Sequence, residues 1–494
     1  MTLAAGAAAA GEPVDISLAG TPETADPPPA RTGRLVPMII GAALLMQTLD
    51  ATVITNALPT MARSLGSDPI TLNLAITAYL VTQAVFLPIS TWIADRFGAK
   101  HVFRAAIIGF AVSSMFCGMA DTLGEIVLAR MAQGLAGALM LPVGRLVLLR
   151  TVPKAQLVRA MSYLTMPALL GPVLGPPIGG FIVTFADWRW IFWINLPMGV
   201  LGLVLVTRYI PHIREFGHQP LDWRGFFLSA CGMAGLVYGF DNLGRGVLPF
   251  AVVAAMLAGG IVCAALYVGH ARRAAHPILD LSLLGIRTFA AASVGGLFSR
   301  LIIGASPFLL AMLLQVGFGL SAFDAGLLTF AGAVGALLMK TTAQPIIARF
   351  GFKPVLVGNA LIVALLSGCY CLFTASTPHW LLVSTLLVGG FFRSLQFTAL
   401  NALGYADVPE ELMSRASSLA SMFQQLARSL GVGLGASLIH TTMVWRGSTV
   451  ATTADIAPAF AVVALISLVA LVFYGALPRD AGSEVSGRRL ARAG

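Results

Sequence analysis

The chain carries very little charge for its length. Only 11% of its 494 residues are Asp, Glu, Lys or Arg, whereas 57% are hydrophobic, and the mean hydropathy is +0.86. An average soluble domain carries roughly 25% charged residues. The shortage of charge therefore excludes a soluble globular protein and predicts a protein that crosses a lipid bilayer many times.

The signatures of several function classes are also missing. The sequence has no glycine-rich loop ending in Lys-Ser or Lys-Thr for ATP, no Ser/His/Asp arrangement and no His/Glu cluster for a metal. The five cysteines all lie inside apolar runs, which disfavours disulfides. We therefore expect no enzymatic activity, no cofactor and no metal site, and we expect energy to come from an ion gradient.

The first 30 residues contain no Lys or Arg and are rich in Ala, Gly and Pro. A secretory signal would need a positive start followed by an apolar core. This segment is therefore expected to be a disordered tail.

Basic residues are unevenly distributed over the rest of the chain. About fourteen apolar runs of near 20 residues lie between residues 36 and 477. With both termini in the cytoplasm, 21 of the 31 Lys and Arg residues fall on the cytoplasmic side, four in outer loops and six inside the runs. This bias predicts a multi-pass protein of the bacterial cytoplasmic (inner) membrane. Because the basic residues are dispersed, we expect no nucleic acid partner, and we expect a monomer.

Two short motifs recur at nearly the same interval. Arg96-Phe97-Gly98 returns as Arg349-Phe350-Gly351, a shift of 253 positions (349 − 96). Val152-Pro153 returns as Val408-Pro409, a shift of 256 (409 − 153). Two repeats in the same order predict that the chain consists of two related halves.

The repeats and the apolar runs together predict an all-α membrane protein with a major facilitator fold. Such transporters have two parallel halves of six helices, and two further helices are inserted here. The expected segments are a disordered cytoplasmic tail, the N-terminal half, the inserted pair with its loops, the C-terminal half and a cytoplasmic tail: 1–33, 34–210, 211–275, 276–478 and 479–494.

Four motifs in order resemble those of the fourteen-helix drug/proton antiporter family (EmrB/QacA type), most closely its MdtD-like branch. They are Leu49-Asp50-Ala51-Thr52-Val53, Asp95-Arg96-Phe97-Gly98 with Lys100, Arg130 with Gln133-Gly134, and the run from Gly171 to Gly180. The resemblance implies export of small molecules, chiefly lipophilic cations, in exchange for protons.

In that family the glycine run is thought to seal the fifth helix against the opposite half. The spacing of Gly171, Gly175 and Gly179 places them on one helix face, where another backbone can approach closely. Tight packing alone is the alternative interpretation. The other motif residues expected to act in the conformational change are Pro172, Pro176 and Gly180.

Asp50 is the one carboxylate well inside a predicted span. A lone acid there costs roughly 2.5–3.5 kcal/mol on insertion scales, so it should be neutral, paired or in a wet cavity. We interpret Asp50 as a proton-coupling residue; the alternative is a structural, hydrogen-bonded acid. The resemblance implies that Arg130 communicates between this site and the substrate cavity, and Gln133 is a cavity candidate.

The predicted spans of the second half contain four cations and no deep acid. The cations are Arg300, Lys340, Arg393 and Arg428. If they line the substrate cavity with Gln396, the solute is an organic anion or a metal-carboxylate complex rather than a cationic drug. Alternatively, backbone carbonyls and Gln side chains hold the arginines in structural roles. Lys340 and Arg145 could instead extend toward the membrane surface.

Asp95 has no acidic counterpart in the second copy of its motif, where Ala348 stands. We expect Asp95 to cap a helix near Ser414 and Arg415 in the opposite half and so to act as a latch. The family pattern has Gly where Thr91 stands, which makes a close approach there doubtful. The combined reading is a proton-coupled multidrug exporter; a non-transporting membrane sensor is the alternative class.

Overall fold

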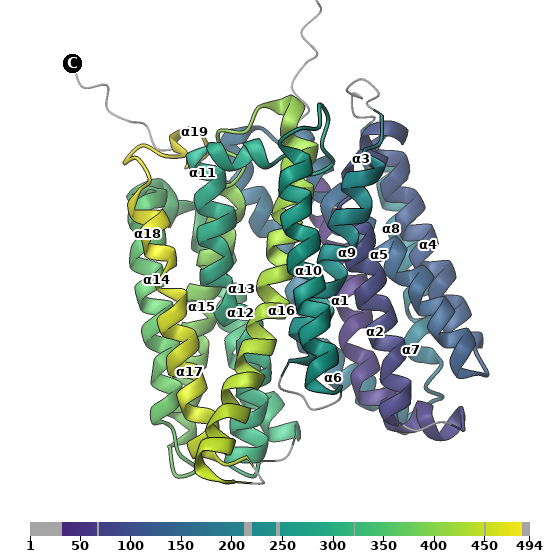
Figure 1. The fold of residues 1–494 in the computed structure, drawn as a ribbon, viewed down its shortest axis with the longest axis vertical. Helices are drawn as coiled ribbons and strands as arrows, with labels where there is room; N and C mark the ends of the chain where they lie inside the picture. The colour runs from purple at the N-terminus through teal and green to yellow at the C-terminus, as the bar shows by residue number, and fades with distance from the viewer. Residues whose placement is uncertain are drawn as a thin grey trace, which may run out of the picture.

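The structure is a computed structural model that describes residues 32–66, 69–211, 220–243, 248–320, 322–448 and 451–486. Within these ranges every regular element is a helix. The early helices and the late helices form two groups side by side, with a pair of central helices in front of them (Figure 1). The first ten α-helices are α1 (Thr32–Ser64), α2 (Pro69–Phe86), α3 (Ser90–Phe97), α4 (Ala99–Met119), α5 (Leu123–Thr151), α6 (Leu157–Phe185), α7 (Trp190–Trp193), α8 (Asn195–Tyr209), α9 (Trp223–Asn242) and α10 (Phe250–Ala271).

The second group begins with a helix that is continuous but irregular. It runs from α11 (Arg287–Ala290) through π-helical turns at Ala291–Gly295 and Met312–Gly317 that flank α12 (Gly296–Ala311). The remaining helices are α13 (Ala322–Phe350), α14 (Phe352–Cys369), α15 (His379–Leu403), α16 (Met413–Arg446), α17 (Thr453–Ser467), α18 (Ala470–Gly475) and α19 (Ser483–Ser486).

All fourteen predicted apolar runs are helical, but they do not all qualify as membrane spans. By length and hydropathy, 10 helices of the described residues could cross a membrane, or up to 11 if α2 and α3, which meet at a 59° bend, form one span. Within the described residues, α9 and α16 are not among them, and parts of α6 lie outside the residues that can be judged. Polar side chains along α16, including Gln424 and Arg428, give one physical reason. The count of fourteen crossings therefore stays a prediction.

The repeated Gly of the charged motif has the same conformation in both copies. Gly98 separates α3 from α4 with φ +85°, and Gly351 separates α13 from α14 with φ +81°. A side chain at either position would be strained, because L-residues rarely adopt this region. Lys100 Nζ donates to the Thr207 carbonyl near the end of α8, and Lys353 Nζ donates to the Leu477 carbonyl after α18. Each lysine thus binds a carbonyl at or just beyond the C-terminal end of a late helix of its group, α8 or α18.

The Val-Pro repeat also has matching local structure. Pro153 and Pro409 have nearly equal backbone angles, with φ −58° and ψ 144° for the first and φ −59° and ψ 148° for the second. Each is followed by a single 3₁₀ turn, Lys154–Gln156 or Glu410–Leu412, and then by a long helix, α6 or α16. The sequence repeats therefore mark equivalent turns.

The inserted helix α9 lies between the two groups. It packs against α2 on one side and α16 on the other, while α10 packs mainly against α9. An apolar cluster joins the three elements: Ala84 and Leu87, Met233 and Val237, and Met422 and Leu426.

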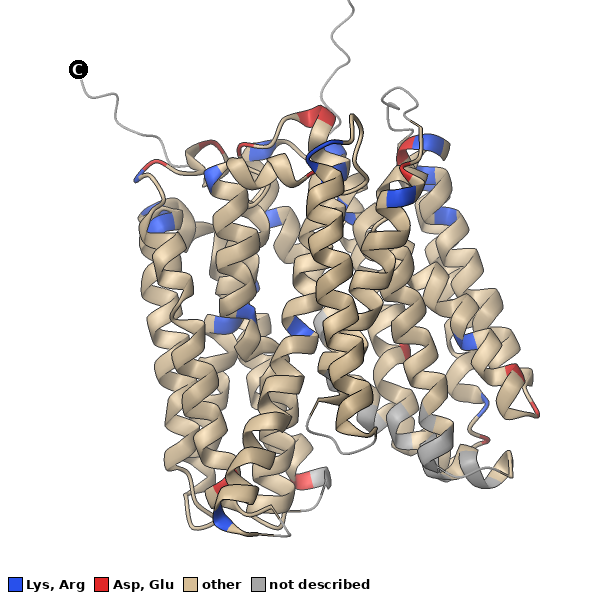
Figure 2. Cartoon of the chain, viewed as in Figure 1, with Lys and Arg blue, Asp and Glu red and all other residues tan. Residues whose placement is uncertain are grey.

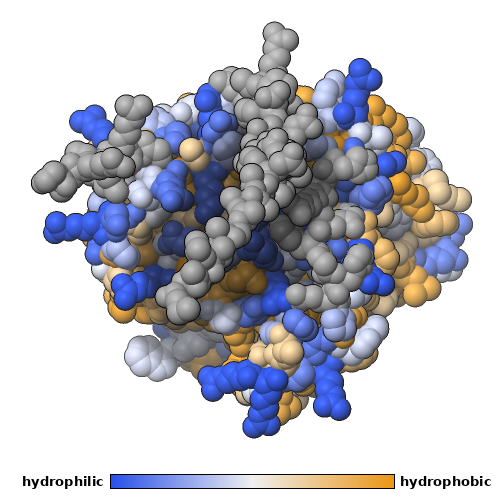
Figure 3. Space-filling view, turned by 90° about the horizontal axis from the view of Figure 1, so that it is seen from above, coloured by the Kyte–Doolittle hydropathy of each residue, from blue (hydrophilic) through white to orange (hydrophobic). Residues whose placement is uncertain are grey.

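Charge is concentrated at one end of the bundle, where α3, α11 and α19 lie; we call it the α3 end. Lys and Arg gather there, and few appear at mid-height (Figure 2). Seen from that end, hydrophilic residues cover much of the face and apolar residues appear around the edge (Figure 3). The charge bias predicts that the α3 end faces the cytoplasm.

Candidate functional site

A buried ion pair lies inside the first group of helices. Arg130 Nη1 on α5 donates to Asp50 Oδ2 on α1 at 2.7 Å, and both side chains are buried. The sequence singles out both residues, and the fold brings them together across 80 positions. Breaking such a pair by removing one partner costs about 3–5 kcal/mol, because the other charge is left unpaired in the interior.

Two amides bind the second oxygen of the Asp50 carboxylate. Gln133 Nε2 and Asn195 Nδ2 each donate to Asp50 Oδ1 at 2.9 Å. Both amides also donate to the hydroxyl of Ser114 on α4, at 2.5 Å and 3.0 Å. Gln133 Oε1 accepts a further hydrogen bond from Arg130 Nη1. The cluster therefore links α1, α4, α5 and α8 around one acid.

Aromatic rings cover the Arg130 guanidinium. Its Cζ lies 4.5 Å from the centroid of the Tyr79 ring and 5.9 Å from that of Phe192. Gln47 Nε2 donates to the Tyr79 hydroxyl at 3.3 Å and to the Gly137 carbonyl at 3.1 Å. A cation over an aromatic face is stabilised further when water is excluded, so these rings help to hold Arg130 in place.

Sequence reasoning did not assign roles to Ser114 and Asn195. Asn195 lies in the tryptophan-rich stretch from Trp188 to Pro197. Polar residues in spans are as often structural as functional. Only the rotation of α4 and α8 in the fold places these two side chains next to Asp50.

The glycine face of α6 packs within its own group of helices. A Cβ at Gly171 would lie 2.2 Å from Oγ1 of Thr48, and one at Gly175 would lie 2.1 Å from Oγ1 of Thr52. Gly179 lies against Val53, and all three neighbours belong to α1. The glycines therefore admit α1 of their own group, while α6 also packs against α13 and α15 of the opposite group. The expected role of this helix as a seal stays a prediction. The side chains of Pro172 and Pro176 lie outside the described residues. Gly180 has open space at its Cβ position.

Asp95 binds within its own half instead of capping a helix of the other half. Arg150 Nη2 at the end of α5 donates to Asp95 Oδ1 at 2.8 Å. Arg415, the expected neighbour, pairs instead with Asp280 at 2.9 Å. The predicted cap near Ser414 is wrong. The end of α5 lies beside α3, and its Arg150 binds the Asp95 carboxylate that was to cap the helix. Arg96 is exposed at the α3 end.

Hydroxyl groups nevertheless join α3 to α16 at this end. Thr91 Oγ1 lies 2.6 Å from Ser418 Oγ. Ser417 Oγ donates to the Pro142 carbonyl of α5 at 3.0 Å. The close approach is thus made with Thr at the position where the family pattern has Gly.

Arg145 crosses the same interface between the two groups. Arg145 is buried, and its guanidinium donates to the Tyr405 hydroxyl at 3.2 Å, to the Ser421 hydroxyl at 3.4 Å and to the side-chain oxygen Oε1 of Gln424 at 3.1 Å. The expectation that Arg145 reaches the membrane surface is wrong, because neutral acceptors of α15–α16 bind it in the interior. Lys340 is likewise buried, and it donates to Thr398 Oγ1 on α15 at 2.8 Å.

The other predicted cavity residues do not share one site. Arg300 is buried and donates to the Ala292 carbonyl of its own helix at 3.0 Å. Arg428 is exposed although it lies mid-helix in α16. Arg145, Arg300 and Arg428 are within electrostatic range of one another. Gln133, by contrast, belongs to the Asp50 cluster.

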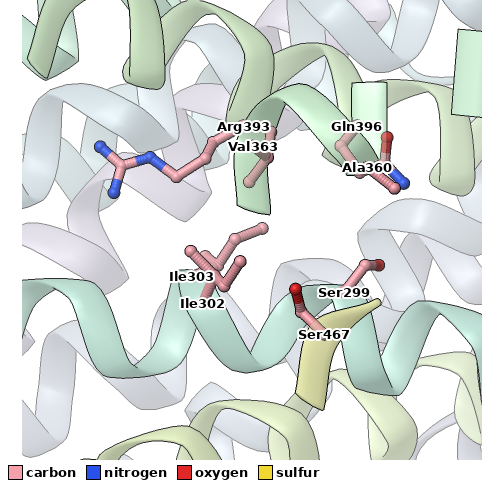
Figure 4. Close-up of a pocket in the computed structure, with 8 residues that line it drawn as sticks. All are labelled: Ser299, Ile302, Ile303, Ala360, Val363, Arg393, Gln396 and Ser467. Atoms are coloured by element: carbon pink, nitrogen blue, oxygen red, sulfur yellow. The ribbon is translucent and has the colours of Figure 1, made fainter. Parts of the chain in front are cut away.

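Arg393 and Gln396 line a small cavity enclosed by α12, α14, α15 and α17 (Figure 4). The Gln396 amide and Ser299 lie toward one side, and the Arg393 guanidinium extends to the opposite side. Asn359 Nδ2 donates to Gln396 Oε1 at 2.7 Å. The lining residues are Ser299, Ile302, Ile303, Ala360, Val363, Arg393, Gln396 and Ser467.

The described residues form two helix groups that are joined at the α3 end, and one group encloses a buried acid–base pair. This arrangement is typical of a membrane transporter. The family model described as the Major Facilitator Superfamily matches residues 40–306 and 292–493. The chain therefore belongs to the Major Facilitator Superfamily, and the predicted fold class is confirmed.

Bacterial relatives cover most of the chain. MdtD of Cronobacter sakazakii, described as a candidate multidrug resistance protein, is 39% identical over 405 residues, which is 81% of this chain and 85% of that protein. The Klebsiella pneumoniae protein of the same name is 37% identical over 464 residues, covering 92% and 97%. The predicted resemblance to MdtD-like proteins is thus confirmed.

Solved structures share the fold at low sequence identity. The human organic anion transporter MFSD10 has a TM-score of 0.62 at 16% identity, covering 90% of this chain and all of that one. The proton:xylose symporter XylE has a TM-score of 0.63 at 15% identity, covering 92% and 98%. At such identity the likeness concerns the fold alone.

Proposed function

We propose that the chain is a proton-coupled exporter that exchanges a cytoplasmic small molecule for protons. The observation that carries the proposal is the buried pair of Asp50 and Arg130. An ionisable residue inside the membrane marks an ion or proton pathway by default. The relatives' description as candidate multidrug resistance proteins supports export of drug-like solutes. Membership of a transporter family disfavours a non-transporting sensor.

In the proposed cycle, a proton from outside neutralises Asp50 and weakens its pairing with Arg130. The described form is joined between groups at the α3 end through Thr91, Arg145 and Ser417. We assign it to the state closed toward the cytoplasm. Loss of the ion pair then favours rocking of the halves about the central site, because the two states bind the proton differently.

Asp50→Asn tests the proposal. In everted vesicles, the proton release that follows substrate addition should be at least tenfold smaller for this variant than for wild type. Substrate binding should stay measurable. Asp121→Asn is the matched control, since Asp121 is an exposed acid that pairs with Arg189 at 2.7 Å. Unchanged coupling in Asp50→Asn would refute the assignment.

A specific arrangement favours a second candidate function, the export of organic anions or of metal-carboxylate complexes. Arg145, Arg300 and Arg428 approach one another, and the described acids of the second group lie at helix ends, as Asp324, Asp407 and Asp455 do. No hydrogen bond or ion pair of Arg428 is seen within the described part of the chain. Arginine recognises carboxylates through paired hydrogen bonds.

Uptake by everted vesicles separates the two substrate classes. We compare a quaternary ammonium dye with a tricarboxylate, the latter with and without a bound metal ion. If the protein exports anions, tricarboxylate transport should fall at least tenfold in Arg300→Ala and in Arg428→Ala. It should not fall in the control Arg208→Ala, because the Arg208 side chain is exposed at the end of α8. Strong dye transport that Arg300→Ala and Arg393→Ala leave unchanged would contradict this candidate.

We also infer a monomer in the bacterial inner membrane with both termini in the cytoplasm and no cofactor. The charge bias of the loops supports the placement of both termini in the cytoplasm. Reporter fusions at the two ends should be active only on the cytoplasmic side. Activity on the outer side at either end would overturn the topology.

A further inference from the structure

The Asp50 carboxylate acts only as a hydrogen-bond acceptor among the described residues. Oδ2 accepts from Arg130, and Oδ1 accepts from Gln133 and Asn195. A protonated carboxyl needs an acceptor for its new O–H, because a buried donor without a partner is destabilising. The described arrangement thus suits the carboxylate and provides no bonded acceptor for the acid.

One buried acceptor of the cluster lacks a partner. The Asn195 side chain is fully buried, and its Oδ1 makes no hydrogen bond to any described residue. Gln133 Oε1 is already bonded to Arg130. Turning the Gln133 amide would disturb its bonds to four residues, Asp50, Ser114, Cys117 and Arg130. Turning Asn195 affects only its bonds to Asp50 and Ser114 and puts Nδ2 in the place of the unpaired Oδ1. Asn195 is therefore the amide whose reversal disturbs fewer bonds.

We propose that the Asn195 amide turns over when Asp50 takes up a proton, so that Asn195 is a proton-dependent positioning residue of the site; this rests on the proposed function. After the turn, Oδ1 occupies the present place of Nδ2, 2.9 Å from Asp50 Oδ1 and 3.0 Å from Ser114 Oγ. The proton comes from the outer solution and binds Asp50 Oδ1. The Asn195 carbonyl accepts the resulting O–H and the hydroxyl proton of Ser114.

The reversed network keeps the same number of bonds to Asn195. Ser114 changes from accepting the Asn195 amide to donating to its carbonyl, and it still accepts from Gln133. Arg130 keeps Gln133 and the Tyr79 ring when its partner becomes neutral. Protonation is thus accommodated by one amide and one hydroxyl without movement of a helix.

Few other ionisable groups face Asp50. They are Arg130 from α5, Tyr79 from α2 and Cys117 from α4. The described residues that α7 and α8 turn toward this site are Phe192 and Asn195. An infrared signal that follows protonation of this cluster below neutral pH therefore reports on Asp50 and its bonded amides.

Difference infrared spectra of the purified protein, recorded between neutral and acidic pH, test the proposal. A side-chain amide C=O band should move to lower wavenumber on acidification, because the Asn195 carbonyl gains two hydrogen bonds. This pair of bands should be absent in Asn195→Leu and in Asp50→Asn. It should persist in Asn359→Leu, a matched control in which another buried amide is removed.

Ser114→Ala provides a variant that leaves Asn195 in place. The band should still move, but by less, because the carbonyl then gains one hydrogen bond. A spectrum of Asn195→Leu with the wild-type band pair, or a full shift in Ser114→Ala, would overturn the proposal. If Asp50→Asn retained proton coupling, the proposed function would fail instead, so the two failures are distinguishable.

Discussion

The hydroxyl of Thr91 on α3 lies 2.6 Å from that of Ser418 on α16, and this contact joins the two helix groups where the sequence pattern has lost a glycine. The neighbouring contact between Ser417 and the Pro142 carbonyl is also made through a hydroxyl. The groups therefore meet at the α3 end through short neutral side chains, which allow helices to pack closely.

The Thr91 contact predicts a crosslink. In the double variant Thr91→Cys/Ser418→Cys, oxidation should form a disulfide and lower transport at least tenfold, because the α3 end cannot then open. Reductant should restore transport. Each single variant is the control for the five native cysteines, which are all free in the described structure. Full transport by the oxidised, crosslinked protein would contradict a gating role for this contact.

Close packing of α6 on α1 predicts unequal effects for two glycines of one motif. Gly175→Ala should destabilise the protein by about 1–3 kcal/mol through overpacking, because its Cβ would meet Thr52 Oγ1. Gly180→Ala, with open space at the same atom, should change stability little. Thermal unfolding in detergent measures both. Equal losses would mean that the glycine face does not set the helix contact.

The salt bridge between Asp95 and Arg150 predicts non-additive mutations. Asp95→Asn and Arg150→Gln should each reduce transport, and the double variant should be little worse than either, because both remove one pair. The coupling energy from the cycle should be about 1 kcal/mol, given that the pair is partly exposed. Ala348→Asn is the control at the position that the repeat matches to Asp95. If the losses of transport in the two single variants added up in the double variant, Asp95 and Arg150 would act independently.

The pairing of Asp280 with Arg415 predicts a pH dependence of stability. Burial raises the pKa of Asp280, but hydrogen bonds from Ser282 and Arg415 outweigh it and lower the pKa below the usual value. A carboxyl with a lowered pKa stabilises the fold above the unfolded value, about 3.9, and this contribution is lost as pH falls through the folded value. The melting temperature of wild type should exceed that of Asp280→Asn at pH values above about 5, and the gap should close below about 4. If the difference in melting temperature persisted in acid, ionisation of Asp280 would not be its cause.

Composition and spacing predict much of this fold because each depends on simple constraints. The bilayer fixes the length of apolar runs, and Gly98 and Gly351 repeat because the turn between helices needs a positive φ. Asp50 and Arg130 stand out because charges are rare at membrane depth. Asn195 and Ser114 could not be found this way, since Ser and Asn are ordinary in spans.

Errors in the predictions arise where helix rotation decides. Position along a helix allows Lys340 and Arg145 to extend toward the membrane surface, the alternative interpretation, but Thr398 and Gln424 bind them from neighbouring helices. Asp95 is predicted to cap a helix of the opposite half near Ser414 and Arg415, whereas it binds Arg150 from α5 of the same half. Position along the chain gives depth in the membrane and leaves the partner undetermined.

The inserted helix α9 makes the two sides of the molecule unequal toward lipid. Met233 of α9 packs in the seam between α2 and α16 together with Met422 of α16. The flexible side chains of methionines can repack as neighbouring helices slide. On the opposite side α6 meets α13 with no inserted helix between them. In the described residues, one helix contact therefore closes the seam at α6 and α13, whereas two contacts, α2 with α9 and α9 with α16, close the other.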